Sequence, residues 1–107
     1  MIIKNYNKLV RDKIPEIINS SGKNETAITR VLTDNEFIKE LNVKLQEEVS
    51  EYMTDNSIEE LADILEVIYA LLLTKNKTFT ELENIRMEKK NKRGGFDKKI
   101  FLINVKK

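Results

Sequence analysis

The chain contains no cysteine and no histidine, and each absence removes a class of chemistry. It has no disulfide framework and no thiolate nucleophile, and neither a zinc finger nor a Ser-His-Asp triad can be built from its residues. Any metal that it binds must therefore be held by oxygen ligands. One proline and three glycines in 107 residues leave no linker-like stretch, so we expect a single domain over residues 1–107.

Long hydrophobic runs are also missing. The longest apolar stretch, from Ile64 to Leu73, is interrupted by Glu66, and the opening MIIKNYNKLV lacks the apolar core and cleavage site of a signal peptide. With 40% hydrophobic and 35% charged residues, the composition is that of a globular protein. We therefore expect a soluble, cytoplasmic protein that does not enter a membrane.

The net charge of +1 conceals a segregation of charge along the chain. Residues 34–66 carry eleven acids against two lysines, a local charge of −9, whereas residues 86–107 carry nine bases against two acids, a local charge of +7. Such sorting indicates a functional site, a partner, or both.

Capping residues and hydrophobic spacing predict four helices. Asp12 is the expected cap of a short first helix, with Pro15 in its first turn and Ile14, Ile17 and Ile18 facing inward, which ends at residues 20–22. Thr33 and Glu36 form a capping-box pattern before a helix over about 34–53.

Two further capping patterns follow. Ser57 with Glu60 starts a third helix that runs to about Lys75, and Thr78 with Glu81 starts a fourth that Gly94 and Gly95 end. Residues 26–32 are expected to form a short strand or an extended loop, with which the apolar tail over 100–105, or residues 1–4, could pair. The predicted fold class is all-α: a central antiparallel hairpin of the second and third helices flanked by the other two, with strands limited to short terminal pieces.

Several carboxylates fall on helix faces that should be apolar. Glu48 lies within about 60° of Leu41, Leu45 and Tyr52 around the second helix, Glu51 falls on the edge of that stripe, and Glu47 lies further round. The third helix is apolar on nearly every side, so we expect it to be buried. Glu60 and Asp63 are nevertheless set into one face of its first turns.

The short turn at 54–57 forces the two helices to run antiparallel as neighbours, which places Glu51 level with about Glu60 and Glu48 level with about Asp63. Four carboxylates converging on one small volume would raise one another's pKa values and cost several kcal/mol without a cation. Mg²⁺ or Mn²⁺, which prefer carboxylate and water oxygens, would resolve that conflict.

Simpler interpretations exist for the individual acids. Glu60 could serve as the reciprocal partner in the capping box of Ser57, and Glu48 could pair with Lys44 four residues earlier. Glu47 and Glu59 fit plain surface charges as well as ligands.

Glu47-Glu48-x-x-Glu51 followed by Glu60-x-x-Asp63 resembles the EExxE and ExxD motifs of the MazG-like, all-α nucleoside triphosphate pyrophosphohydrolases. YNKLVRDKIPEII (residues 6–18), RVLTDNEF (30–37) and KRGGF (92–96) resemble the phosphoribosyl-ATP pyrophosphohydrolase-like subgroup, so the resemblance covers almost the whole chain. It implies Mg²⁺-dependent hydrolysis of a nucleoside triphosphate, or a related nucleotide such as phosphoribosyl-ATP, to the monophosphate and pyrophosphate in a helical dimer or tetramer, as in nucleotide-pool house-cleaning.

The residue types suit this chemistry, which needs positioning and charge neutralisation more than covalent catalysis. The candidate metal ligands are Glu48, Glu51, Glu60 and Asp63, and Glu47, Glu48 or Glu51 would orient the attacking water as general base. Cations for the triphosphate are available at both ends of the chain, as Lys8, Arg11 and Lys13 and as Lys89, Lys92 and Arg93. Arg11 could instead pair with Asp12. Tyr6, Tyr52 and Phe96 are candidates for stacking on a base, although the spacing of Tyr52 also suits a core position.

Two other classes of function compete with the enzyme. A nucleic-acid-binding protein would use the basic C-terminal segment, but the −9 block disfavours it because it would repel phosphate. A catalytically inactive helical interaction module would keep the apolar periodicity without constraining its acids. Whatever the function, the third helix has more apolar surface than the three other helices of one chain can cover, so we expect a homodimer or homotetramer.

Overall fold

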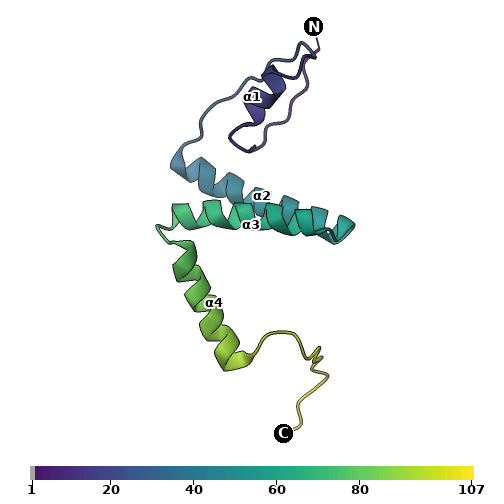
Figure 1. Ribbon diagram of the computed structural model, residues 1–107, viewed down its shortest axis with the longest axis vertical. Helices are drawn as coiled ribbons and strands as arrows, with labels where there is room; N and C mark the ends of the chain where they lie inside the picture. Colours follow the sequence, from purple (N-terminus) through teal and green to yellow (C-terminus); the bar gives the residue numbers. More distant parts are fainter. Residues whose placement is uncertain (1) are drawn as a thin grey trace.

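In the computed structural model, which describes residues 2–107, the chain folds into four α-helices, and none of these residues forms a strand. The helices are α1 (Ile14–Asn19), α2 (Asp34–Asp55), α3 (Ile58–Thr74) and α4 (Phe79–Arg93). Figure 1 shows α2 and α3 side by side across the middle of the molecule, with α1 and α4 on opposite sides of this pair. The all-α prediction is confirmed. No helix among the described residues is long and apolar enough to cross a membrane.

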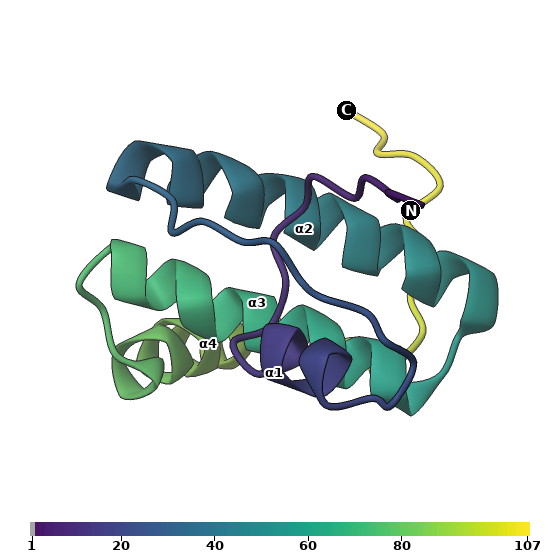
Figure 2. The same cartoon turned by 90° about the horizontal axis from the view of Figure 1, so that it is seen from above.

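The antiparallel hairpin of α2 and α3 is the centre of the fold, and these are the two helices that pack extensively against each other (Figure 2). Asn56 makes the reversal possible because it adopts the left-handed conformation, with φ 54°, and its amide donates to the carbonyl of Tyr52. Ser57 then caps α3 by accepting from the amide of Glu60. The turn is as short as the sequence indicated.

Capping also explains the beginnings of the other helices. Thr33 with Glu36 and Thr78 with Glu81 each form a complete capping box, as predicted for α2 and α4. The prediction for α1 was wrong at its cap, because the residue in that position is Lys13 and no side chain caps the helix. The adjacent Pro15 has no amide hydrogen to be capped, which reduces the need for one.

Residues 26–32 and 100–105 form no strand, and neither pairs with residues 2–4, so the structure shows the loop that was one of the two alternatives for residues 26–32. Helices α1 and α4 do not flank the hairpin closely: α4 leads away from the end of α3, and the tail continues to the far end of the long axis (Figure 1). The prediction that α1 buries Ile17 was wrong too, since this side chain is exposed.

The resulting shape is extended. The radius of gyration is 19.1 Å, against about 13 Å for a compact chain of this length, and the molecule measures 68 × 32 × 24 Å. The buried apolar side chains of the described part are Leu41 on α2 and Val67 on α3. Within the described part of the chain, α3 keeps an exposed apolar face turned away from α2, in line with the expectation that it has more apolar surface than its neighbours can cover. Its packing on a second copy stays a prediction.

Candidate metal centre

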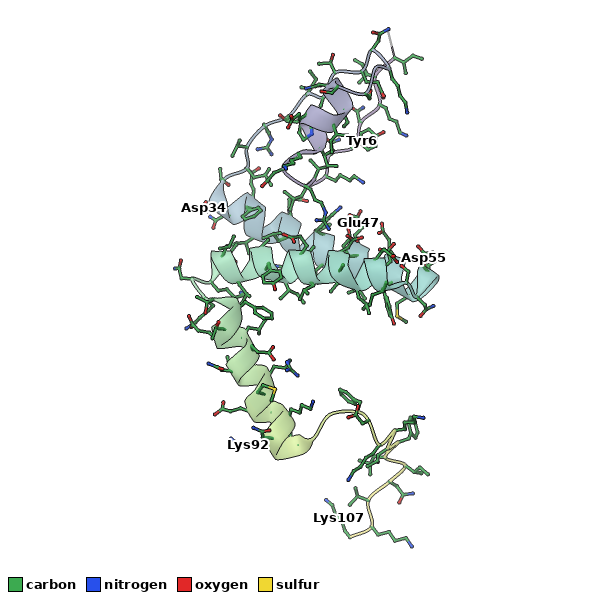
Figure 3. The ribbon with its side chains drawn as sticks, in the orientation of Figure 1. Tyr6, Asp34, Glu47, Asp55, Lys92 and Lys107 are labelled. Carbon is green, nitrogen blue, oxygen red and sulfur yellow. The ribbon has the colours of Figure 1, made fainter. Side chains whose placement is uncertain are left out.

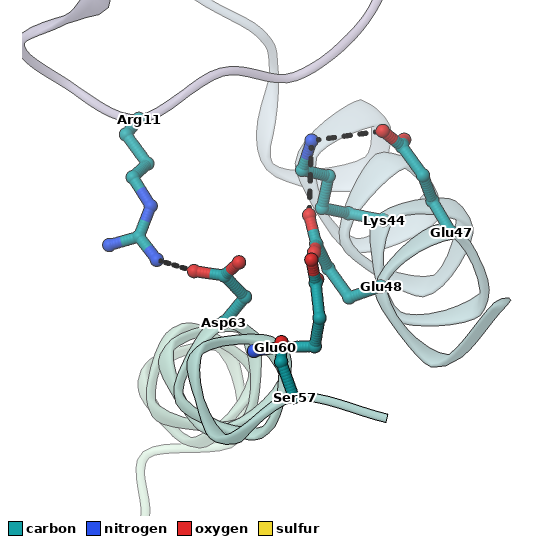
Figure 4. A network of polar contacts seen from close by, with 7 residues as sticks. All are labelled: Arg11, Lys44, Glu47, Glu48, Ser57, Glu60 and Asp63. Carbon is teal, nitrogen blue, oxygen red and sulfur yellow. Dashed lines mark hydrogen bonds and ion pairs between the residues drawn. The ribbon is translucent and has the colours of Figure 1, made fainter. Parts of the chain in front are cut away.

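Three carboxylates meet between α2 and α3. Glu48 is 7% exposed, and Glu60 and Asp63 are half-buried on the facing helix. One carboxylate oxygen from each residue lies within 4.8 Å of the others (Figure 4). The apolar stripe of α2 and the short turn bring these acids together, as their positions on the helices indicated.

A second group of acids shares Glu48. Glu47, Glu48 and Glu51 also place one oxygen each within 4.8 Å of one another, with Glu47 half-buried and Glu51 exposed. The expectation that Glu47 is more exposed than Glu51 was wrong, because the Glu47 carboxylate lies against Lys44 and Lys8. Because Glu48 belongs to both groups, all five carboxylates form one continuous acidic cluster, defined here as Glu47, Glu48, Glu51, Glu60 and Asp63.

Two oxygens in the acidic cluster are buried without a hydrogen-bond partner, Oε2 of Glu48 and Oε2 of Glu60. The capping box expected at Ser57 is incomplete. The Ser57 hydroxyl accepts a hydrogen bond from the Glu60 amide, but the Glu60 carboxylate accepts none from the Ser57 amide. Buried polar atoms are normally paired, so these two oxygens are the places where a ligand would relieve a cost.

Two members of the acidic cluster, Glu48 and Glu60, have raised pKa values. Burial raises the pKa of Glu48, and the nearby charges of Glu51 and Asp63 raise it further, while Lys44 acts in the opposite direction. Burial likewise raises the pKa of Glu60, again with contributions from the charges of Glu51 and Asp63. Glu51, although exposed, is thus close enough to both helices to influence each acid.

Lys44 supplies one cation to the cluster from within α2. Its ammonium lies 3.3 Å from Glu47 and 3.5 Å from Glu48, so the pairing of Glu48 with Lys44 that the spacing allowed does occur. It reaches one oxygen of Glu48 and leaves the other, Oε2, unpaired. The ion pair therefore reduces the charge of the cluster without satisfying it.

The segment before α1 supplies two more cations. Arg11 donates a 2.7 Å hydrogen bond to Asp63 (Figure 4), and Lys8 lies 4.0 Å from Glu47. The alternative in which Arg11 pairs with Asp12 is not what the structure shows. Sequence reasoning placed Arg11 and Lys8 on the substrate but missed their contacts with the acids, for which no local pattern gives a signal. Lys13 is exposed at the start of α1.

The basic residues of α4 lie elsewhere. Lys89, Lys92 and Arg93 are on the helix that leads away from the hairpin, and Figure 3 shows Lys92 well separated along the long axis from Glu47. Lys89 and Arg93 line an open cavity of about 700 Å³ together with Phe96. Within one chain, these cations and the acidic cluster do not form a common site.

The aromatic residues that are candidates for stacking on a base also lie in different parts of the molecule. Tyr6 is exposed, and the ammonium groups of Lys4 and Lys8 lie 5.1 and 5.9 Å from its ring centre. Tyr52 is half-buried on α2, in keeping with a packing role, and Phe96 is almost fully exposed after α4. Tyr6 therefore lies in the same segment as Lys8 and Arg11, two of the cations that contact the acidic cluster.

Comparison with known proteins adds little to this geometry. No family model matches the chain, and no solved structure matches it. A stretch of 44 residues, 41% of the chain, is 50% identical to an uncharacterized protein of Mycolicibacterium smegmatis (strain ATCC 700084 / mc(2)155). The match spans 43% of that protein's length, less than half of either chain.

Proposed function

We propose that this chain is a Mg²⁺-dependent nucleoside triphosphate pyrophosphohydrolase of the MazG-like group, in the phosphoribosyl-ATP pyrophosphohydrolase-like subgroup. The observation that carries the proposal is the meeting of Glu48, Glu60 and Asp63 within 4.8 Å across two helices, with two buried oxygens left unpaired. The residues that make up the resembling motifs are the same residues that form this cluster.

The donor set fits a hard divalent cation. Four carboxylates, from Glu48, Glu51, Glu60 and Asp63, offer oxygen ligands of the kind that Mg²⁺ and Mn²⁺ prefer, and the sequence contains no cysteine or histidine to offer a thiolate or an imidazole. Bound there, Mg²⁺ would neutralise phosphate charge and lower the pKa of a water molecule. The unpaired Oε2 atoms of Glu48 and Glu60 give the ion a structural reason to bind.

Side chains of the protein would supply the general base and the positive charge that binds the substrate phosphates. One carboxylate among Glu47, Glu48 and Glu51 orients the attacking water and accepts its proton. Arg11 holds a phosphate oxygen of the substrate through its planar fork when it exchanges its contact with Asp63, and Lys8 and Lys13 add positive charge on the same side. Water attack releases pyrophosphate and leaves the nucleoside monophosphate.

The finer features of the assembly belong to the same proposal. A MazG-like architecture completed by a homodimer or homotetramer would cover the apolar face of α3, and it would give Lys89, Lys92 and Arg93 a route to the acidic cluster of another copy. We also propose that the protein works in the cytoplasm, where nucleoside triphosphates and Mg²⁺ are abundant.

The test is a panel of nucleoside triphosphates incubated with the full chain and millimolar Mg²⁺, with pyrophosphate and monophosphate measured separately. We expect stoichiometric release of both, and a loss of more than about 100-fold in Glu48→Gln and Asp63→Asn, since even the partners of metal ligands contribute that much. Glu59→Gln, which removes an exposed acid on α3 outside the cluster, is the matched control.

Three outcomes would reject the proposal. One is the absence of pyrophosphate release with every nucleotide in both Mg²⁺ and Mn²⁺. Another is unchanged turnover in both cluster variants. The third is salt-sensitive DNA binding without hydrolysis, which would favour a nucleic-acid-binding protein that uses the basic C-terminal segment.

A further inference from the structure

One face of α3 carries an apolar stripe that the rest of the described chain leaves largely exposed. Phe79 contacts this stripe at Tyr69. Its residues recur every three or four positions and are all exposed, most strongly at the two ends, where Ile58 is 72% and Leu73 is 75% exposed. We define this α3 stripe as Ile58, Leu61, Leu65, Tyr69 and Leu73. From first to last residue it is about 22 Å long, at 1.5 Å per residue.

The C-terminal tail presents a second uncovered apolar surface. In the segment from Ile100 to Val105, every apolar side chain is 69–88% exposed. Successive side chains of an extended chain point to opposite sides, so this run is apolar on both sides. A run of this kind is typical of a segment that is buried on both sides. At about 3.3 Å per residue its length is about 17 Å, which fits within the α3 stripe.

Two groups could cover the α3 stripe, a second α3 helix or the C-terminal tail, and charge favours the tail. Helix α3 carries four acids and no base, so two α3 helices packed together would bring like charges into proximity. Two of these acids, Glu59 and Glu66, lie along one edge of the stripe. The tail is bounded by Lys98 and Lys99 before its apolar run and by Lys106 and Lys107 after it, so it complements that edge.

The tail does not reach the stripe of its own chain. The junction between α3 and α4 is fixed by the amide of Lys77 donating to Leu72, by the capping box of Thr78, and by the contact of Tyr69 with Phe79, whose ring centres lie 5.1 Å apart. From this junction α4 leads away from the hairpin and carries the tail to the far end of the molecule (Figures 1 and 3). The stripe and the tail therefore remain apart within one chain.

We propose that the tail of one copy, residues 100–105, packs along the α3 stripe of a second copy, and that the exchange is reciprocal. Two such contacts related by a two-fold axis close a dimer and cover both apolar surfaces at once. The proposal rests on the proposed homodimer and names the segment that covers α3 in it. Its test does not depend on catalysis, because both surfaces lie outside the acidic cluster.

Disulfide trapping tests the contact, since the chain has no cysteine of its own. Leu65→Cys and Phe101→Cys are made in separate chains, one labelled with ¹⁵N, and the two are unfolded together, refolded and oxidised. We expect the mixed product to exceed either self-linked product several-fold, because a mixed link requires tail and stripe of different copies to touch. Glu88→Cys on α4 replaces Leu65→Cys as the control and should give little mixed product.

Light scattering supplies the second readout. We expect the native chain to have twice the mass of one chain at micromolar concentration and Ile103→Asp to have the mass of one. Lys23→Ser, at an exposed position between α1 and α2, is the control that remains dimeric. Helix content measured by circular dichroism should be the same in all three. A monomeric native chain overturns the proposal.

Two further results would also overturn it. Self-linked Leu65→Cys as the main product, with Ile103→Asp still dimeric, indicates that α3 packs on a second α3. An intrachain disulfide in the double variant of Leu65→Cys and Phe101→Cys, with no mixed product from the single variants, indicates that the tail returns to its own chain.

Discussion

Arg11 and Asp63 are separated by 52 residues in the sequence, and the guanidinium of Arg11 donates a 2.7 Å hydrogen bond to the carboxylate of Asp63. The contact holds the segment before α1 against the first turns of α3. It also places a phosphate-binding type of side chain directly on a proposed metal ligand. Under the proposed function, Arg11 would exchange this carboxylate for a phosphate of the nucleotide.

The first prediction concerns this exchange. Arg11→Met should raise KM for the best nucleotide by about 10- to 100-fold, the value of one charge-assisted hydrogen bond, and should change kcat much less. Its free energy of unfolding should change by less than about 1 kcal/mol, because both partners of the ion pair are partly exposed. Steady-state kinetics and urea unfolding measure the two effects. Arg11→Lys should recover part of the affinity, and an unchanged KM in Arg11→Met would contradict a role in substrate binding.

The second prediction concerns the response to metal. The native chain should gain about 2.7 kcal/mol of stability at a Mg²⁺ concentration one hundred times the dissociation constant. Glu48→Gln and Asp63→Ala should gain much less. In the absence of metal, Glu48→Gln should be at least as stable as the native chain, because it removes repulsion among the remaining acids.

Thermal melts with and without Mg²⁺ check this prediction, with Glu59→Gln as the control that responds like the native chain. If Glu48 were only a structural partner of Lys44, Glu48→Gln would keep both the Mg²⁺ response and turnover. The same two measurements on Asp63→Ala provide an independent test from the opposite helix.

The third prediction concerns the start of α2. Thr33 accepts from the amide of Glu36, whose carboxylate accepts from the Thr33 amide and is also held by Arg30. Thr33→Ala should therefore lower the free energy of unfolding by about 1 kcal/mol. Thr54→Ala, near the other end of the same helix, removes an exposed hydroxyl and should change it by less than about 0.5 kcal/mol. Equal effects of the two substitutions in urea unfolding would contradict the importance of the cap.

Features that depend on nearby residues could be predicted from the sequence. The capping boxes of α2 and α4 and the reversal at residues 54–57 need residues only a few positions apart, and the structure contains them. The convergence of Glu48 with Glu60 and Asp63 follows from helical periodicity and that short turn. In each case the local geometry leaves the chain few alternatives.

Features that depend on distant contacts could not be predicted. No spacing links Arg11 to Asp63, because the intervening chain crosses two loops and two helices. The direction of α4 is set by the junction at residues 75–78, where Asn76 adopts a left-handed conformation that periodicity does not indicate. The spacing of α3 predicted more apolar surface than one chain covers, and the exposed stripe agrees with this, but local spacing does not indicate what covers it.

The last prediction concerns pH in the absence of metal. Burial and neighbouring charge raise the pKa of Glu48 and of Glu60 above the ordinary value of 4.5. A raised pKa means that the folded state keeps protons that the unfolded state has already released. The stability contributed by these protons is fully present below the unfolded pKa and is lost as pH rises through the folded pKa.

With a chelator present, the melting temperature of the native chain should therefore fall as the pH rises from about 5 to 7. Glu36 acts in the opposite sense, because hydrogen bonding from Arg30 lowers its pKa to about 2, and its contribution is lost as pH falls below the ordinary value. That loss lies below the measured window, so it does not mask the effect. In Glu48→Gln the decline should be shallower, since Glu60 alone remains to titrate, whereas Glu59→Gln should retain the native slope. A melting temperature that stays level or rises over this range in the native chain would show that the enclosed carboxylates keep ordinary pKa values.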